Sequence, residues 1–297
     1  MSLETSVSSI KLRNPLILSS GILGASYSSL QRMYEAGLGA VVTKSIGIKS
    51  RGGNPNPSIF ALQEIRSVIS SVGLANPGYS VFRDDVKTAI EKKVPTIVSI
   101  FGKTIEEFED VLEGLNDLSF LSYELNIERL DQHPDIIFEL VQSLKKKTTK
   151  PIWVKLTPND NNMSIIADAA IQGGCDVLVA INTVKAMAID IQTKQPFLGA
   201  KRGGLSGAAI KPIGIRCVYD LYEQFGDKIP IIGVGGISNG EDVIEYLLAG
   251  ASAVQIGTAI GVTYPENMIK FIQMKIKNYM KEQEIKKISE IIGGAHK

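Results

Sequence analysis

Eight short runs of apolar, mostly β-branched residues recur along the sequence, and helix-like stretches separate them. Each run is apolar throughout, without alternating polar residues, which is typical of strands buried on both faces of a parallel sheet. Five of the seven intervals between run starts are 24, 27, 29, 25 and 22 residues, the length of one strand–helix unit. The runs span residues 16–19, 40–43, 96–100, 123–126, 152–156, 177–181, 231–233 and 253–256.

Eight strand–helix units within about 250 residues predict an α/β fold, a (β/α)8 TIM barrel, with a doubly wound parallel sheet as the alternative. The near-regular spacing and the lack of a Pro/Ser-rich linker favour the barrel, and they favour one domain over residues 1–297. Residues 268–292 are rich in Lys, Glu and Ile at helical spacing. We therefore expect a C-terminal helix that packs outside the barrel.

Composition excludes several classes of protein. Hydrophobic residues make up 44% and charged residues 21%, which excludes a disordered chain, and a net charge of +1 gives no basic footprint for nucleic acid. Two cysteines favour a reducing, cytoplasmic setting, and two histidines, His133 and His296, argue against a histidine metal site. No apolar run reaches the length of a membrane span. We expect no metal, nucleic-acid or membrane partner.

The two long intervals, of 56 and 54 residues, follow the second and sixth predicted strands. Loops after strands lie on the face of a barrel that holds the active site. The first insertion carries the glycine-containing turns 52–57 and 73–78, and the second carries 203–207. We expect both long loops above the barrel mouth.

Polar residues stand where six of the strands should end, and they should converge on one rim. One polar strand end is ordinary, but two lysines and two asparagines on one mouth favour a ligand site. The residues are Ser20, Lys44, Ser45, Ser99, Asn126, Lys155, Asn182 and Thr183.

Glycines follow the last two strands, at 233–236 and at Gly257-Thr258. Barrels often bind phosphate at this position through backbone N–H groups, and we expect a phosphate site here. Ser238 or Asn239 can cap the following helix. Cys175 and Cys217 are expected to fill the core, and a surface position is the default for His133.

These residues resemble dihydroorotate dehydrogenase, the FMN enzyme of pyrimidine biosynthesis, over about residues 10–262. The motifs that carry the resemblance are Asn14-Pro15, Ser20-Gly21, Thr43-Lys44-Ser45, Gly53-Asn54-Pro55, residues 73–78, Glu124-Leu125-Asn126, residues 154–159, Ile181-Asn182-Thr183-Val184, residues 202–212 and residues 232–237. They look most like the soluble B type, a catalytic subunit that works with an iron–sulfur, FAD-containing partner using NAD. The resemblance implies FMN-dependent oxidation of dihydroorotate to orotate in the cytoplasm, by a chain that is usually a homodimer.

The resemblance also implies roles for single residues. The flavin ring and ribityl would contact Ser20, Lys44, Ser45, Ser99, Asn126, Lys155 and Ile181, and the phosphate end would contact Gly207, Gly235, Gly236, Gly257 and Thr258. The substrate would contact Lys44, Ser70, Ser71, Val72, Gly73, Leu74, Asn126, Asn182 and Thr183.

The chain departs from the family where the catalytic base is expected. In the family a cysteine or serine after the fourth strand removes a substrate proton, but Arg129 occupies that position and cannot be a base. Glu128, Asp131 or His133 are the candidate replacements. The alternatives are a different substrate, such as an anion held by Arg129, or a partner-dependent flavoprotein with little activity alone. A flavin-free barrel that binds a phosphate sugar is a further alternative. A second departure from the family is Ser70, which stands where the family has asparagine.

Overall fold

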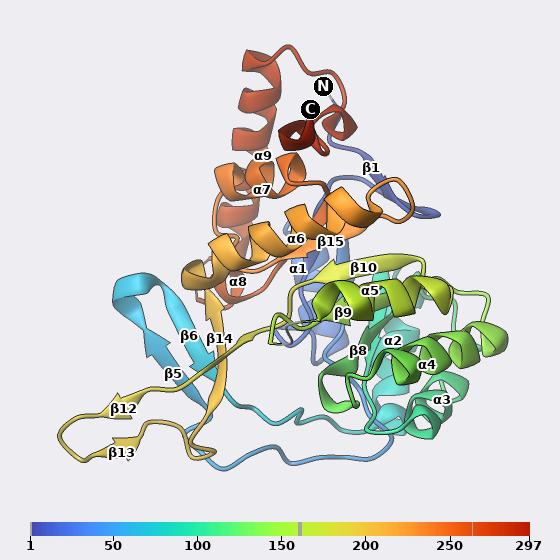
Figure 1. Ribbon diagram of the computed structural model, residues 1–297, viewed down its shortest axis with the longest axis vertical. Helices are drawn as coiled ribbons and strands as arrows, with labels where there is room; N and C mark the ends of the chain where they lie inside the picture. The colour runs from blue at the N-terminus through green and yellow to red at the C-terminus, as the bar shows by residue number, and fades with distance from the viewer. Residues whose placement is uncertain (1, 160–161, 263) are drawn as a thin grey trace.

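The computed structural model describes residues 2–159, 162–262 and 264–297. Eight parallel strands form a closed barrel in the order β10-β15-β16-β3-β4-β7-β8-β9, and helices surround it (Figure 1). The predicted (β/α)8 barrel is confirmed. Its strands are β3 (Leu16–Leu18), β4 (Ala40–Val42), β7 (Thr96–Ile100), β8 (Ser122–Asn126), β9 (Ile152–Leu156), β10 (Val177–Ala180), β15 (Ile231–Val234) and β16 (Ala251–Ile256).

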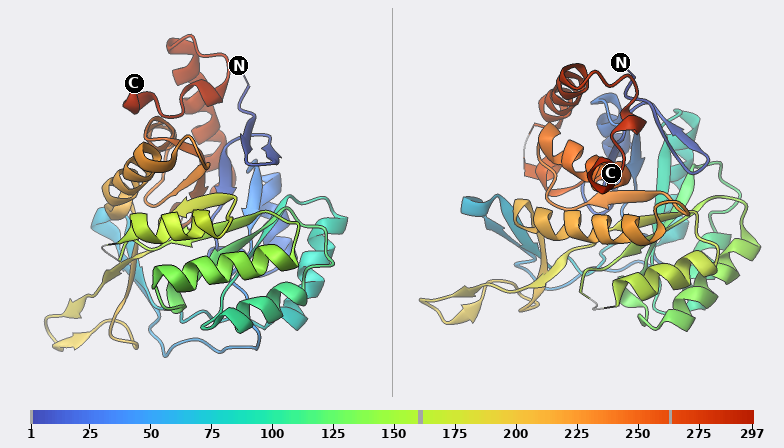
Figure 2. Two further views of the ribbon diagram at one scale, coloured as in Figure 1. Left: turned by 45° about the vertical axis from the view of Figure 1, so that its right-hand side comes forward. Right: turned by 45° about the horizontal axis from the view of Figure 1, so that its top comes forward.

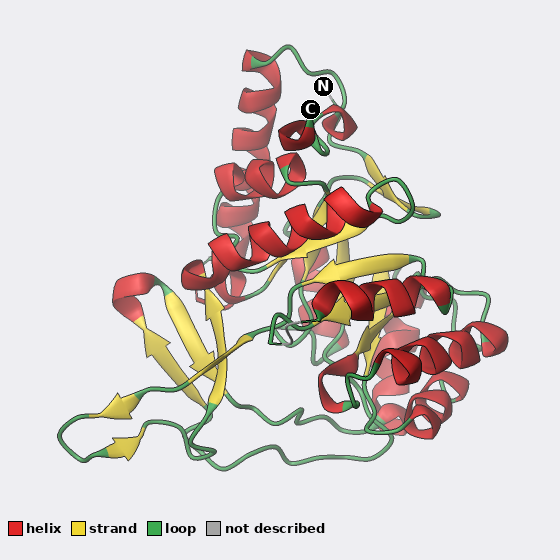
Figure 3. Ribbon diagram, in the orientation of Figure 1, coloured by secondary structure: helices red, strands yellow, loops and turns green. Residues whose placement is uncertain are grey.

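One helix follows each of the first seven barrel strands, and two follow the last. They are α1 (Tyr27–Glu35), α2 (Tyr79–Glu91), α3 (Ile105–Glu113), α4 (Pro134–Lys147), α5 (Met163–Gln172), α6 (Lys211–Phe225), α7 (Gly240–Leu248), α8 (Thr258–Val262) and α9 (Pro265–Glu282). Figure 3 shows these helices outside the strands. Their apolar faces bury one side of each strand, so the strands need no polar alternation.

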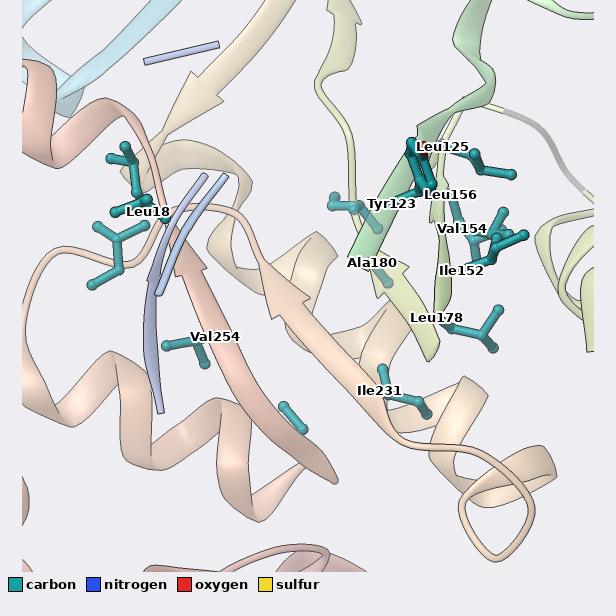
Figure 4. Close-up of a cluster of buried hydrophobic side chains, with 14 of the residues drawn as sticks. Leu18, Tyr123, Leu125, Ile152, Val154, Leu156, Leu178, Ala180, Ile231 and Val254 are labelled. Carbon is teal, nitrogen blue, oxygen red and sulfur yellow. The ribbon is translucent and has the colours of Figure 1, made fainter. Parts of the chain in front are cut away.

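Side chains of successive strand residues point to opposite faces, and this separates two apolar layers. On β9, Val154 belongs to the large layer between strands and helices, part of which Figure 4 shows. Trp153 belongs to a second cluster inside the barrel, which includes Val7 and Ile10 from an N-terminal hairpin. The hairpin strands are β1 (Thr5–Val7) and β2 (Ile10–Leu12). The barrel interior is therefore apolar at the end that this hairpin covers.

The two predicted insertions pair with each other in one antiparallel sheet of order β11-β14-β6-β5. Its strands are β5 (Ile59–Leu62), β6 (Ser67–Ser70), β11 (Val184–Ala186) and β14 (Gly203–Gly207). The central pairing aligns Gly204 with Ser70 and Gly207 with Ser67. A short hairpin of β12 (Ile189–Asp190) and β13 (Gln195–Pro196) projects from the body of the molecule in Figures 1 and 2.

The predicted C-terminal helix over 268–292 is wrong in its bounds. Helix α9 begins at Pro265 and ends at Glu282, and two 3-10 turns follow, η4 (Ile288–Glu290) and η5 (Gly294–His296). Ile288 and Ile291 are 1% and 2% exposed, so the chain turns back to bury them against the core. A straight continuation of the helix would lose that burial. The remaining short turns are η1 (Gln63–Ile65), η2 (Ile127–Arg129) and η3 (Ala208–Ile210).

Candidate functional site

A buried lysine lies inside the barrel, near the carboxyl ends of the strands, which we call the mouth. Lys155 follows Trp153 by two residues on β9, so its side chain shares the inward face. Its Nζ atom lies 3.0 Å from Oε1 of Gln255, 3.5 Å from Oε1 of Glu124, and 3.4 and 3.3 Å from the hydroxyls of Ser19 and Ser20. We call Lys155, Glu124, Gln255, Ser19 and Ser20 the lysine cluster.

Charge inside the lysine cluster is balanced but incompletely hydrogen-bonded. Lys155 and Glu124 have side chains only 4% and 0% exposed. Gln255 donates to one oxygen of Glu124, while the other oxygen, Oε1, has no hydrogen-bond partner within the described chain. Three of the four lysine contacts are 3.3 Å or longer. An ammonium with loose contacts can donate to a further acceptor at the mouth.

Two asparagines form a second polar group on the rim. Asn182 Nδ2 lies 3.4 Å from Oδ1 of Asn126, and Asn126 donates over 3.1 Å to the hydroxyl of Ser45. Ser45 in turn pairs with Ser99 over 2.9 Å. We call Asn126 and Asn182 the amide pair. Amide side chains both donate and accept, so the pair suits a flat ligand with carbonyl and N–H edges.

Lys44 is the second ammonium predicted at the rim. Burial lowers the pKa of Lys44, because desolvation disfavours the charged form. Its backbone N–H donates to Gly24, but its side chain has no hydrogen bond or ion pair to any residue that the structure describes. Lys44 therefore retains its donors for a ligand.

Glycines end β15 and follow β16, as the sequence indicates. Gly235 and Gly236 have φ angles of +125° and +71°, which favour glycine, and their N–H groups make no hydrogen bond within the described ranges. Gly257 differs, since a Cβ there would meet Ser19 and Ile22 at ordinary distances of 3.5 and 3.7 Å. Thr258 donates over 2.8 Å to Ser206 on the insertion sheet. Free N–H groups and open space at this edge suit an anionic group.

The N-terminus of α7 is already occupied by the protein's own carboxylate. Asn239 caps the helix as predicted, and Asp242 completes a capping box. Asp242 also accepts from the backbone N–H of Ser238, and its other oxygen lies 2.9 Å from Nζ of Lys211. An anion at this edge would therefore use the free glycine N–H groups and not the first turn of α7.

The turn over residues 70–74, predicted to touch the substrate, lies in the first insertion. Asn54 holds it by donating over 2.9 Å to the Ser71 hydroxyl. Gly73 has a φ of +77°, and a Cβ there would overlap the side chain of Asn54 at 2.5 Å. Gly204 connects the insertion to the rim: it pairs with Ser70, and a Cβ on it would overlap Thr183. Within the described chain, no hydrogen bond or ion pair joins this turn directly to the amide pair, so its role in binding remains a prediction. Its other members are Val72 and Leu74, and Gly207 lies at the end of the same sheet with φ +95°.

The loop after β8 separates the three candidates for the base. Glu128 Oε2 lies 3.4 Å from Nδ2 of Asn182. His133 is 62% exposed and lies 3.5 Å from Asp135, away from the amide pair. Asp131 is exposed and has no ion pair with any described residue, and Arg129 likewise is exposed without one.

Comparison with known proteins identifies the family. The family model for dihydroorotate dehydrogenase matches residues 2–280. A protein of Methanocella arvoryzae named dihydroorotate dehydrogenase B (NAD(+)), catalytic subunit, is 44% identical, with 100% of this chain and 99% of that protein covered. Proteins of the same name from Methanocaldococcus jannaschii and Pyrococcus abyssi are each 42% identical, with 99% of this chain and 98% and 99% of theirs covered. The chain belongs to the dihydroorotate dehydrogenase family.

Membership makes the chain an oxidoreductase acting on CH–CH groups. The family match, over residues 2–280, also extends beyond residues 10–262, the region over which the sequence motifs indicated the resemblance. Neither cysteine can serve this dehydrogenase as a base. Burial raises the pKa of Cys175 to about 12 and that of Cys217 to about 11, so both thiols stay protonated at neutral pH.

Three members of the lysine cluster were not predicted as site residues of this dehydrogenase. Ser19, Glu124 and Gln255 are 6%, 0% and 1% exposed, and they lie within or beside apolar runs that read as core. The sequence did contain a signal for Gln255. It lies within an apolar strand, two residues after the inward-facing Ala253, and must therefore face the barrel interior. Within the described ranges, no group of His, Cys, Asp and Glu side chains is arranged to hold a metal ion. No described helix is long and apolar enough to cross a membrane.

Proposed function

We propose that this chain is the FMN-binding catalytic subunit of a dihydroorotate dehydrogenase, which oxidises dihydroorotate to orotate in pyrimidine biosynthesis. The observation that carries the proposal is the lysine cluster, with a 4% exposed ammonium beside the mouth of the barrel. Burying a lysine is costly, and besides the 3.5 Å pair with Glu124 this ammonium makes only one hydrogen bond as short as 3.0 Å. A ligand that accumulates negative charge at this point would complete its contacts.

The residues present fit a flavin mononucleotide. Lys155, with Ser20, Ser45, Ser99 and Asn126, would face the ring system, and Ile181 would line it. At the phosphate end, Gly235 and Gly236 would donate through their free N–H groups, and Gly257 would leave room. Gly207 and Thr258 complete this predicted set. When bound, the flavin supplies the acceptor for two electrons from the substrate.

Substrate recognition would fall to the other side of the mouth. The amide pair can match the carbonyl and N–H edges of a dihydropyrimidine, and Lys44 can neutralise its carboxylate. Binding an anion next to Lys44 favours the charged form of that lysine, which opposes the effect of burial. Thr183, packed against β14, would fix the distance between the barrel rim and the insertion sheet.

Electron transfer out of the site would need a partner. The similar proteins are named as catalytic subunits of an NAD(+)-linked enzyme, which supports an electron-transfer subunit for this chain as well. We include in the proposal an iron–sulfur, FAD-containing partner, a homodimer of the chain and a cytoplasmic setting. Co-expression with that partner and measurement of NAD-dependent orotate formation would test the pairing.

An anaerobic visible spectrum of the purified chain, before and after dihydroorotate is added, tests the proposed function. We expect a flavin spectrum that dihydroorotate bleaches. Colourless protein that binds no added FMN would refute flavin binding. A spectrum that dithionite bleaches but dihydroorotate does not would refute the substrate, and it would favour another substrate for Arg129 or a partner-dependent subunit.

A further inference from the structure

Removing two hydrogens from a CH–CH pair releases one hydride and one proton, and the proton needs an acceptor on the protein. We propose that the carboxylate of Glu128 is this general base. The inference rests on the proposed function, since it concerns the dihydroorotate bound at the same mouth. Among the described residues of the loop after β8, Glu128 is the one whose side chain hydrogen-bonds to the amide pair.

The geometry connects Glu128 with the predicted substrate groups through a single amide. Nδ2 of Asn182 lies 3.4 Å from Oε2 of Glu128 and 3.4 Å from Oδ1 of Asn126. The backbone of Glu128 is also tied to the amide pair. Its N–H donates over 3.3 Å to Oδ1 of Asn126, which caps η2. A ligand gripped by the amide pair therefore lies within reach of this carboxylate.

The other titratable groups of the region are less suitable. Glu124 is fully buried and engaged with Gln255 and Lys155. His133 turns to Asp135. Asp131 is exposed and makes no contact with the amide pair within the described residues. Lys44 is the rival, because burial lowers its pKa and its side chain is free.

The charged groups near Glu128 come from its own loop and from the neighbouring elements of the barrel rim. Its own loop carries Arg129, Asp131 and His133, and β9, which packs against η2, carries Lys155. Lys44 lies after β4 on the same rim. The positive groups Arg129, Lys155 and Lys44 therefore come from three different elements of the same rim.

The step balances in atoms and electrons. A C5–H bond of dihydroorotate breaks, its proton forms an O–H bond on Glu128, and its electron pair becomes the second bond between C5 and C6. The hydride on C6 would leave with two electrons, for which the flavin of the proposed function would be the acceptor. Water at the exposed Glu128 then takes the proton from the carboxyl.

The decisive experiment compares Glu128→Gln with the matched control Asp131→Asn, which removes the same charge from the same loop. Anaerobic stopped-flow measures flavin reduction by dihydroorotate in each holoprotein. We expect the Glu128→Gln rate to fall about 10²–10⁴-fold, the usual contribution of a general base, and the control to stay near the wild-type rate. Glu128 is exposed, so neither change should impair folding.

A pH profile and a binding measurement separate a base from a merely structural residue. The wild-type rate should fall about tenfold per pH unit on the acid side, as Glu128 takes up a proton, and this limb should vanish in Glu128→Gln. Calorimetric titration with orotate should show that Glu128→Gln binds this anion several-fold more tightly, because a like charge is gone.

Two results would overturn the inference while leaving the proposed function in place. They are a Glu128→Gln rate near wild type, and a slow variant that retains the acid limb, which would transfer the role to Lys44. If dihydroorotate does not reduce even the wild-type flavin, the proposed function itself fails.

Discussion

Replacing Lys155 with methionine should destabilise the barrel, because the change leaves Glu124 buried without its counter-charge. The two charged atoms lie 3.5 Å apart on side chains that are 4% and 0% exposed. At an effective dielectric constant of about 20, the attraction over this distance is about 5 kcal/mol, and breaking a buried pair typically costs about 3–5 kcal/mol. We expect the free energy of unfolding of Lys155→Met to fall by an amount in that range.

The matched control is the double variant Lys155→Met/Glu124→Gln, which removes both charges and keeps the side-chain volumes. It should recover most of the lost stability, because a neutral amide carries no buried charge. Both variants lack the lysine, so they lose any flavin contact equally. The difference between their free energies of unfolding therefore measures the cost of leaving the Glu124 carboxylate buried without a partner.

Urea unfolding can be followed through Trp153, the single tryptophan of the chain, which is fully buried inside the barrel. A single variant as stable as the double variant would refute the reasoning, since Glu124 would then not depend on Lys155.

Further predictions concern the phosphate edge and the thiols. Gly257→Ala should keep its urea midpoint yet weaken FMN binding, whereas Gly236→Ala should lower stability as well, because φ is +71° and its Cβ would approach α6 to 2.6 Å. Asp242→Asn should lose about 1–3 kcal/mol in urea unfolding, since it weakens a capping box and an ion pair. Cys175 and Cys217 should resist a thiol reagent at about pH 8 until the protein unfolds, because burial raises their pKa to about 12 and about 11.

The barrel was predictable because its signal is local. Each strand is a continuous apolar run, and all eight runs became barrel strands with ends shifted by at most two residues, as in β16, which begins at Ala251. The rim followed from the same rule, since residues such as Lys155 and Asn126 end parallel strands and must meet at one edge.

What the sequence did not predict depends on contacts between distant segments. The insertion sheet joins β6 and β14, whose partners Ser67 and Gly207 lie 140 positions apart, and neither strand has more than two consecutive large apolar residues. The turn after α9 is set by burial of Ile288 and Ile291, which only the folded core defines. The contact between Glu128 and Asn182 likewise links two different loops, so the sequence left three candidate bases, of which we propose Glu128.

The barrel interior changes character along its axis, and this change argues for a ligand at the mouth. Near the N-terminal hairpin the inward residues are apolar, such as Trp153 and Val179. Two positions further along β9 the inward residue is Lys155, paired with Glu124. Apolar residues of similar volume would often be as stabilising as a buried ion pair, or more so. The retained pair is therefore weak evidence of stabilisation, and it agrees with the proposal that the ammonium serves a ligand.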